Sequence, residues 1–288
     1  MKRFIVFTLV FLSYIHLVSS QEKEYTSVIY PEDYTAQIDV VYTQVNDWVG
    51  HMDLYTKPNE TKPTPVVINI HGGGWRTGNK ESQTGLGTFF KHGYAIANIA
   101  YRLVDVAPAP AAIEDVRCAL IYIYKNAKVL NIDTSKIVIM GGSAGGHLAL
   151  MAGLLGNNKS FDTNCPNTEH IKVAAIIDKY GVTDLTPLAY WKSANNWLSF
   201  NNTDSAFVES VSPINYISRH SPPIFIAHGN ADPIVPYQQS VILYKKLKFY
   251  RVKTEFLTIK KGKHGNFTTK QNIQLSKSIW RFLNKLGL

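Results

Sequence analysis

Cysteine is scarce in this sequence, and that scarcity excludes several kinds of site. The 288 residues contain two cysteines, Cys118 and Cys165, and no CxxC or HExxH spacing, so we expect no metal site. Cys118 occupies an apolar position in a helical pattern, where a free cysteine packs well, and we expect it to be unpaired. A Cys118–Cys165 disulfide is the alternative, because an oxidising compartment permits one.

Long apolar segments and blocks of like charge are also lacking. After the N-terminus no segment reaches about 18 unbroken apolar residues, so no membrane-spanning helix or stable membrane anchoring is expected. The formal net charge is +9, and the lysines are spread out, with local density at 245–248 and 260–263. A solvated basic face is the simplest interpretation, and attraction to acidic polymers or membrane surfaces is the alternative. We find no nucleic-acid-binding motif, internal repeat or linker.

The N-terminus has the pattern of a signal peptide. Two basic residues precede an apolar run over 4–18, and small residues suited to a cleavage site follow it. The run is too short and wrongly flanked for a good transmembrane helix. We therefore predict a signal peptide at 1–20 and a secreted or periplasmic protein with a single domain at 21–288. An uncleaved N-terminal anchor is the alternative.

Strand and helix patterns alternate from residue 64 to the end. The continuous apolar run "TPVVINIH" is typical of a buried parallel strand. This alternation predicts an α/β fold, with a mostly parallel sheet and helices on both faces. Further strands are predicted at 34–45, 48–57, 94–103, 135–141, 171–181, 222–229 and 253–260, and helices at 84–93, 110–130, 145–156, 238–250 and 269–287. The polar and aromatic segment 185–221 breaks the alternation and is predicted to be a short insertion over the ligand-binding edge of the sheet.

A serine lies among glycines between a predicted strand and a predicted helix. Residues 141–145, "GGSAG", match the G-x-S-x-G pattern in the strand–turn–helix context of a nucleophile elbow. Gly141 and Gly145 would admit the sharp turn, and the N-terminus of the helix would direct its amides and positive dipole end at Ser143. A phosphate-binding turn is the alternative interpretation of the glycines alone.

The partners that a serine nucleophile needs follow in the expected order. A serine hydroxyl needs a base, and the base needs an acid to orient it. In this type of fold the acid and then the histidine come after the serine. Asp232 follows the strand "IFIAHG", and His264 follows the last strand. Ser143, Asp232 and His264 are therefore the predicted catalytic residues.

Other histidines and acids fit these roles less well. His228 lies at the end of a strand and has no acid placed after it to orient it as a base, so we expect a structural role. His147 lies within the elbow helix and is interpreted as a packing or supporting residue. Asp184 is the alternative acid in a shifted arrangement. His170 and His220 precede strands, at the wrong end of the sheet.

A second glycine-rich segment, "HGGGWRTG" at 71–78, follows the strand that begins at residue 64. Acyl transfer passes through an oxyanion that needs backbone N–H donors fixed in advance. The HGGG pattern in this loop is typical of lipases and esterases, where the amide of the residue after the serine completes the site. We predict Gly73, Gly74 and Ala144 as the oxyanion donors. His71 is expected only to hold the loop, and a plain glycine turn is the alternative.

The ordered motifs resemble those of the α/β-hydrolase esterases of the hormone-sensitive-lipase type. The resemblance covers nearly all of residues 35–288. Within this family the sequence is most similar to a secreted bacterial branch that includes feruloyl and acetylxylan esterase-like proteins. The resemblance rests on "HGGGW", "AYRL", "IEDVRCAL", "IDTSKIVIMGGSAGGHLA", "YGVTDL", "SPINYI" and "HGNADPIVPYQQS". It implies an eight-stranded sheet, ester hydrolysis without a cofactor, and the same Ser143, Asp232 and His264. One departure is Gly142, which stands where many relatives have an acidic residue.

Together these features predict a secreted serine esterase for short-chain or aromatic acyl groups. Its substrate would be a small ester or an acylated saccharide, for example one with acetyl or feruloyl groups on a plant polysaccharide. The aromatic residues expected to line the pocket are Trp75, Tyr190, Trp191 and Trp197; packing of the insertion onto the core is their alternative role. The alternative functions are a serine peptidase of the same fold, which usually carries an additional large domain, and a non-catalytic binding protein.

Overall fold

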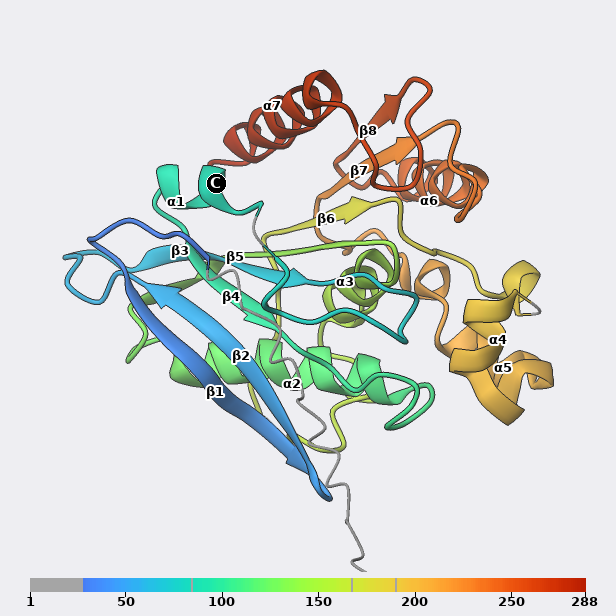
Figure 1. The fold of residues 1–288 in the computed structure, drawn as a ribbon, viewed down its shortest axis with the longest axis horizontal. Coiled ribbons are helices and arrows are strands. Elements are labelled where there is room, and N and C mark those ends of the chain that lie inside the picture. The colour runs from blue at the N-terminus through green and yellow to red at the C-terminus, as the bar shows by residue number, and fades with distance from the viewer. Residues whose placement is uncertain (1–27, 84, 167, 190) are drawn as a thin grey trace, which may run out of the picture.

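A computed structural model describes residues 28–83, 85–166, 168–189 and 191–288 (Figure 1). The predicted signal peptide at 1–20 and the predicted pocket residue Tyr190 lie outside the described residues. The sheet has eight strands in the order β1-β2-β4-β3-β5-β6-β7-β8. The strands are β1 (Thr35–Val45), β2 (Trp48–Thr56), β3 (Thr64–Ile70), β4 (Ala95–Ile99), β5 (Ile132–Gly142), β6 (Ala175–Lys179), β7 (Ile224–Gly229) and β8 (Thr254–Ile259).

The sheet is parallel from β4 to β8, and β1 and β2 join it as antiparallel strands. The α helices are α1 (Gly87–Lys91), α2 (Ala111–Asn126), α3 (Ala144–Leu155), α4 (Lys192–Leu198), α5 (Ser205–Ser210), α6 (Gln238–Phe249) and α7 (Thr269–Lys285). This arrangement confirms the predicted α/β-hydrolase fold with a mostly parallel, eight-stranded sheet.

Two hydrophobic cores lie on opposite faces of the sheet. Val67 belongs to the core under α1 and α7, whereas its neighbour Ile68 belongs to the core shared with α2, α3 and α6. Because both faces are covered, the central strands are apolar without alternation. Helix α2 buries Ile113, Leu120 and Ile123, which recur at helical spacing. Helices therefore cover both faces, as expected.

The insertion is partly helical. It contains α4, α5 and three short 3-10 turns, η1 (Thr186–Leu188), η2 (Ser199–Thr203) and η3 (Pro213–Tyr216). Helices α4 and α5 lie together at one side of the molecule, in yellow and orange in Figure 1. Trp197 of α4 is fully buried and stacks on Trp75, with 4.7 Å between ring centroids. This stack attaches the insertion to the loop that follows β3.

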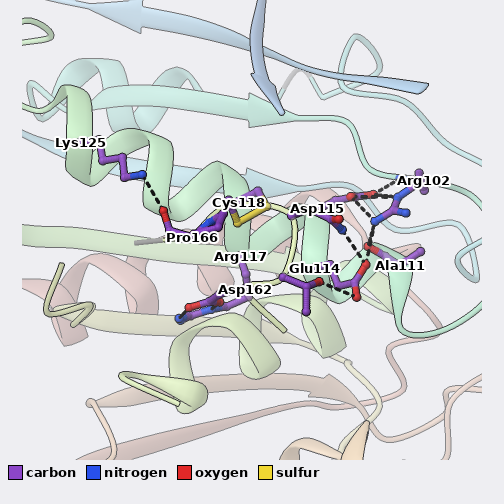
Figure 2. The surroundings of a disulfide bond; sticks show 12 residues. Arg102, Ala111, Glu114, Asp115, Arg117, Cys118, Lys125, Asp162 and Pro166 are labelled. Carbon is purple, nitrogen blue, oxygen red and sulfur yellow. Dashed lines mark hydrogen bonds and ion pairs between the residues drawn. A yellow bond between two sulfur atoms is a disulfide. The ribbon is translucent and has the colours of Figure 1, made fainter. Parts of the chain in front are cut away.

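The two cysteines form a disulfide, so the expectation of a free Cys118 was wrong (Figure 2). The Cα atoms of Cys118 and Cys165 lie 5.4 Å apart. An ion pair between Arg117 and Asp162, 2.7 Å long and buried, holds the loop that carries Cys165 over α2. An apolar helix position suits a disulfide as well as a free thiol, and only the path of this loop decides between them.

Candidate active site

Ser143 lies in a strained turn between β5 and α3. Its backbone has φ 58° and ψ −125°, a conformation that residues other than glycine rarely adopt. The backbone is too tightly packed here for side chains at residues 141 and 145. A Cβ on Gly141 would lie 2.1 Å from the carbonyl oxygen of Gly145, and one on Gly145 would lie 2.3 Å from that of Ile70. The glycines therefore allow the geometry of a nucleophile elbow.

The structure brings together Ser143, His264 and Asp232. The His264 Nε2 atom lies 2.8 Å from Ser143 Oγ, and its Nδ1 atom lies 2.7 Å from Asp232 Oδ2. Asp232 follows β7 and His264 follows β8, so both reach the carboxyl edge of the sheet where β5 ends. A proton on Nδ1 donates to the carboxylate and leaves Nε2 free to accept the serine proton.

The Asp232 carboxylate is completely buried and accepts four hydrogen bonds. Its Oδ1 atom accepts from the amides of Ile234 and Val235 at 2.7 and 3.0 Å. Its Oδ2 atom faces His264 and, at 3.2 Å, His228. Burial alone would raise the pKa of Asp232, but these hydrogen bonds hold it well below its usual range. The acid is therefore ionised and fixed in place.

His228 contacts the candidate acid, a role that the sequence analysis missed. Its Nε2 atom also lies 3.1 Å from the carbonyl oxygen of Val235. Since a carbonyl only accepts, Nε2 carries the proton, and Nδ1 accepts from Ser240 Oγ at 2.8 Å. The interpretation that no acid serves His228 was wrong, because Asp232 turns back toward the strand end. The four-residue spacing of His228 and Asp232 was the available signal.

The predicted oxyanion residues border the same cleft as Ser143. Gly73 and Gly74 have positive φ values of 119° and 61°, and both line the cleft together with Ala144. His71 is buried, stacks on Tyr101 at 4.2 Å, and has Nδ1 2.8 Å from the Gly72 carbonyl oxygen. Burial lowers the pKa of His71. This placement agrees with its expected role of holding the loop.

A buried lysine anchors the chain that follows this loop. Lys80 Nζ lies 2.7–2.8 Å from carboxylate oxygens of Asp39, Asp53 and Glu81. Burial alone would lower the pKa of Lys80, but the three carboxylates raise it above its usual value. Asp39 belongs to β1 and Asp53 to β2, so the lysine ties the segment after the glycines to two strands. The glycine-rich loop at 71–78 therefore has fixed support.

The cleft above Ser143 has a volume of about 490 Å³. The insertion supplies an apolar side that includes Leu188, Trp191 and Ala194. Of the predicted aromatic residues, Trp75 and Trp191 line the cleft. Trp197 does not: its ring is buried in the stack with Trp75, and packing the insertion is its role.

Gly142, the unexplained glycine of the elbow, makes room for Tyr180. A Cβ on Gly142 would lie 2.9 Å from Tyr180 Oη. The Tyr180 ring also packs edge-on against His264, with 4.9 Å between centroids. Burial raises the pKa of Tyr180 to about 12, so its hydroxyl is neutral. An acidic side chain at residue 142 would collide with this ring.

His147 and Asp184 serve local structure. His147 is buried, accepts from Trp75 Nε1 at 3.3 Å and donates from Nε2 to the Val211 carbonyl oxygen at 2.8 Å. Burial lowers the pKa of His147 to about 4, so it is neutral. The carboxylate of Asp184 accepts from the amide of Thr186 within its own turn. The alternative of Asp184 as the acid finds no support in these contacts.

Two other kinds of feature are absent from the described part of the chain. Within residues 28–83, 85–166, 168–189 and 191–288, no group of three or more histidine, cysteine or acidic side chains could hold a metal ion. Over the same residues, none of the helices has the length and apolar character needed to cross a membrane.

Comparison with known proteins identifies a family. The BD-FAE family model matches residues 52–247. Two curated relatives come from Mycobacterium tuberculosis. The probable carboxylic ester hydrolase LipM is 30% identical over 72% of this chain and 51% of its own length. Esterase LipC is 28% identical over 73% of this chain and 55% of its own length. The chain thus spans about half the length of these relatives.

Solved structures cover more of the chain. A truncated carbohydrate esterase from gut microbiota is 28% identical with a TM-score of 0.74, covering 90% of this chain and 99% of that one. An acetyl ester-xyloside bifunctional hydrolase from Caldicellulosiruptor lactoaceticus is 27% identical with a TM-score of 0.70, covering 83% of this chain and 90% of that one. Both likenesses cover more than four fifths of this chain.

Proposed function

Because the chain belongs to the BD-FAE family of α/β-hydrolases, we propose that it is a carboxylic ester hydrolase acting through an acyl-enzyme on Ser143. The observation that carries the proposal is the continuous hydrogen-bonded chain from Ser143 through His264 to Asp232. Its serine stands in a strained turn at the mouth of a cleft, and its acid is ionised. These are the parts that serine acyl transfer requires.

The geometry supports a two-step mechanism. The Oγ atom of Ser143 attacks the ester carbonyl while Nε2 of His264 takes its proton, and Asp232 stabilises the imidazolium. The backbone amides of Gly73, Gly74 and Ala144 stabilise the oxyanion. The intermediate then expels the alcohol, which receives the proton from His264. Water, deprotonated by the same imidazole, releases the acid and restores Ser143.

We further propose that the substrate is a small ester or an acylated saccharide with a short or aromatic acyl group. Support comes from the names of two structural neighbours, a carbohydrate esterase and an acetyl ester-xyloside hydrolase. The short insertion leaves a cleft of about 490 Å³ with an apolar side at Trp191. Such a cleft suits an acetyl or aromatic acyl group better than a long chain.

We propose that the protein acts outside the cytoplasm. The signal-peptide pattern at 1–20 motivates this proposal. The Cys118–Cys165 disulfide supports it, because such bonds persist mainly in oxidising compartments.

The proposed activity is tested with p-nitrophenyl acetate, methyl ferulate and acetylated xylan. We expect hydrolysis of at least one, and stoichiometric labelling of Ser143 by an organophosphonate. Ser143→Ala should lower kcat about 10⁴- to 10⁶-fold, whereas Ser135→Ala, at an exposed serine of β5, should be unaffected. A folded protein that is inert to every ester and to the organophosphonate would contradict the proposal.

A further inference from the structure

The positive charge of this protein is concentrated in its last 49 residues. Residues 240–288 contain 12 lysines and arginines and one acidic residue, Glu255. The preceding 239 residues contain 18 basic and 20 acidic residues, so they carry almost no net charge. All the basic residues of the C-terminal segment except Lys246 are exposed. Glu255 pairs with two of them, Arg281 and Lys285.

This basic segment adjoins the candidate active site. It comprises most of α6, the edge strand β8 and α7, and the two helices lie on opposite faces of the sheet (Figure 1). The loop between β8 and α7 carries His264, and three exposed lysines, Lys260, Lys261 and Lys263, lie just before that histidine. A concentration of one charge beside a cleft attracts ligands of the opposite sign.

One further lysine, Lys179, borders the cleft itself. It is the last residue of β6, pairs in register with Gly142, and its carbonyl oxygen accepts from the amide of Ser143 at 2.9 Å. Because paired residues of neighbouring strands point to the same face of a sheet, the Lys179 side chain lies on the Gly142 side of the nucleophile. The ring of Tyr180, the next residue, packs against Gly142 at the same place.

Lys179, which is half-buried, lacks the partners that the buried Lys80 has. Lys80 contacts three carboxylates, but within the described chain no carboxylate lies within 4.0 Å of Lys179. The described residues that line the cleft likewise include no aspartate or glutamate. Burial lowers the pKa of Lys179, and the charge of Asp178 only partly opposes this effect. An anionic ligand would supply the missing counter-charge.

Resting on the esterase activity proposed above, we propose that the substrate carries a carboxylate, which Lys179 binds inside the cleft while the basic C-terminal segment attracts it. The ligand class is an acidic ester, such as an acylated saccharide that contains a uronic acid. The carboxylate takes no part in the reaction: it places the ester carbonyl beside Ser143. Lys179 is therefore a specificity-determining residue.

The test compares acidic esters with neutral esters of nearly the same shape. 4-Acetoxybenzoate and 4-acetoxybenzamide place the charge on the alcohol side, and monoethyl adipate and ethyl adipamate place it on the acyl side. Each kcat/KM is divided by the rate of hydroxide hydrolysis. In at least one pair we expect the wild type to have a normalised kcat/KM about 10-fold or more higher for the ester with the carboxylate than for its amide. This preference should decrease as the salt concentration is raised from about 20 mM to about 500 mM.

Lys179→Met should lower this preference about 10- to 100-fold. Lys263→Met removes the same charge from the exposed loop beside His264 and should retain most of the preference. Labelling of Ser143 by an organophosphonate measures the folded fraction of each variant. If Lys179→Met does not fold, the wild-type preference and its loss with salt decide the question.

Two outcomes would overturn this inference and leave the esterase proposal standing. The first is a wild type that cleaves each ester with an amide group at least as well as its partner with a carboxylate. The second is a preference for the carboxylate that Lys179→Met retains. Failure of the esterase proposal looks different, because the wild type would then cleave none of the four esters and Ser143 would not be labelled.

Discussion

The imidazole of His228 lies 3.2 Å from Oδ2 of Asp232, the same oxygen that faces His264. His228 donates its Nε2 proton there and does not approach Ser143, so it is a positioning residue. It holds the acid from the strand side while the backbone amides of Ile234 and Val235 hold Oδ1. The acid is therefore oriented by groups other than the histidine that contacts Ser143.

His228→Phe keeps a ring but removes this hydrogen bond. Because hydrogen bonds to charged groups contribute about 1.5–3 kcal/mol, we expect kcat/KM for p-nitrophenyl acetate to fall about 10-fold, mainly in kcat. Organophosphonate titration corrects for any unfolded protein. The control is His220→Phe, at an exposed histidine. Equal activity of His228→Phe and wild type would contradict the positioning role.

Gly142→Ala tests the fit between the elbow and Tyr180. The added Cβ would lie 2.9 Å from Tyr180 Oη, which would push the ring toward His264. A displacement near 1 Å in a catalytic group costs on the order of 100-fold, so we expect kcat/KM to fall about 10- to 100-fold. Gly142→Ala/Tyr180→Phe removes the nearest atom and should recover part of the loss. No recovery in the double variant would mean that another contact is responsible.

The disulfide should stabilise the fold without affecting the chemistry. Closing a loop with a sequence separation of 47 residues limits the entropy of the unfolded chain, which corresponds to about 4 kcal/mol at most in simple models. We expect reduction to lower the free energy of unfolding by about 2–4 kcal/mol, measured by urea denaturation. Neither cysteine lines the cleft, so the folded reduced enzyme should remain active. The Cys118→Ser/Cys165→Ser variant should not respond to reductant.

His147 should make the protein sensitive to acid. Its pKa in the folded state is about 4, below the value of 6.5 for an exposed histidine, so unfolding takes up a proton at intermediate pH. The stability is fully present above pH 6.5 and declines as the pH falls toward 4, by at most about 3 kcal/mol. His147→Gln should lose less stability than the wild type between pH 7 and pH 4.5 in urea denaturation. Parallel losses in the two proteins would exclude His147 as the cause.

The sequence predicted the features that depend on local pattern. Buried parallel strands require apolar runs, and the turn at Ser143 requires glycines, so both could be recognised along the chain. The observed ends of helices and strands differ from the predicted ends by a few residues. The helix predicted at 110–130, for example, ends at Asn126. Ends depend on contacts rather than on periodicity.

Features made by distant segments were harder to predict. The pairing of Cys118 depends on the loop that an Arg117–Asp162 ion pair holds over α2. Trp197 and Trp191 are equally aromatic, and only the packing shows that one is buried and the other borders the cleft. The hydrogen bond of His228 and the fit of Gly142 likewise depend on how strand ends meet in space.

The cleft is built from two groups of residues with separate roles. Ser143, Asp232 and His264 come from the sheet edge, whereas the insertion contributes the wall with Leu188, Trp191 and Ala194. Substitutions or insertions in that segment can reshape the wall while leaving the reacting atoms where they are. Such modularity lets one scaffold acquire new ester preferences in small evolutionary steps, and it marks this segment as the natural target for redesigning selectivity.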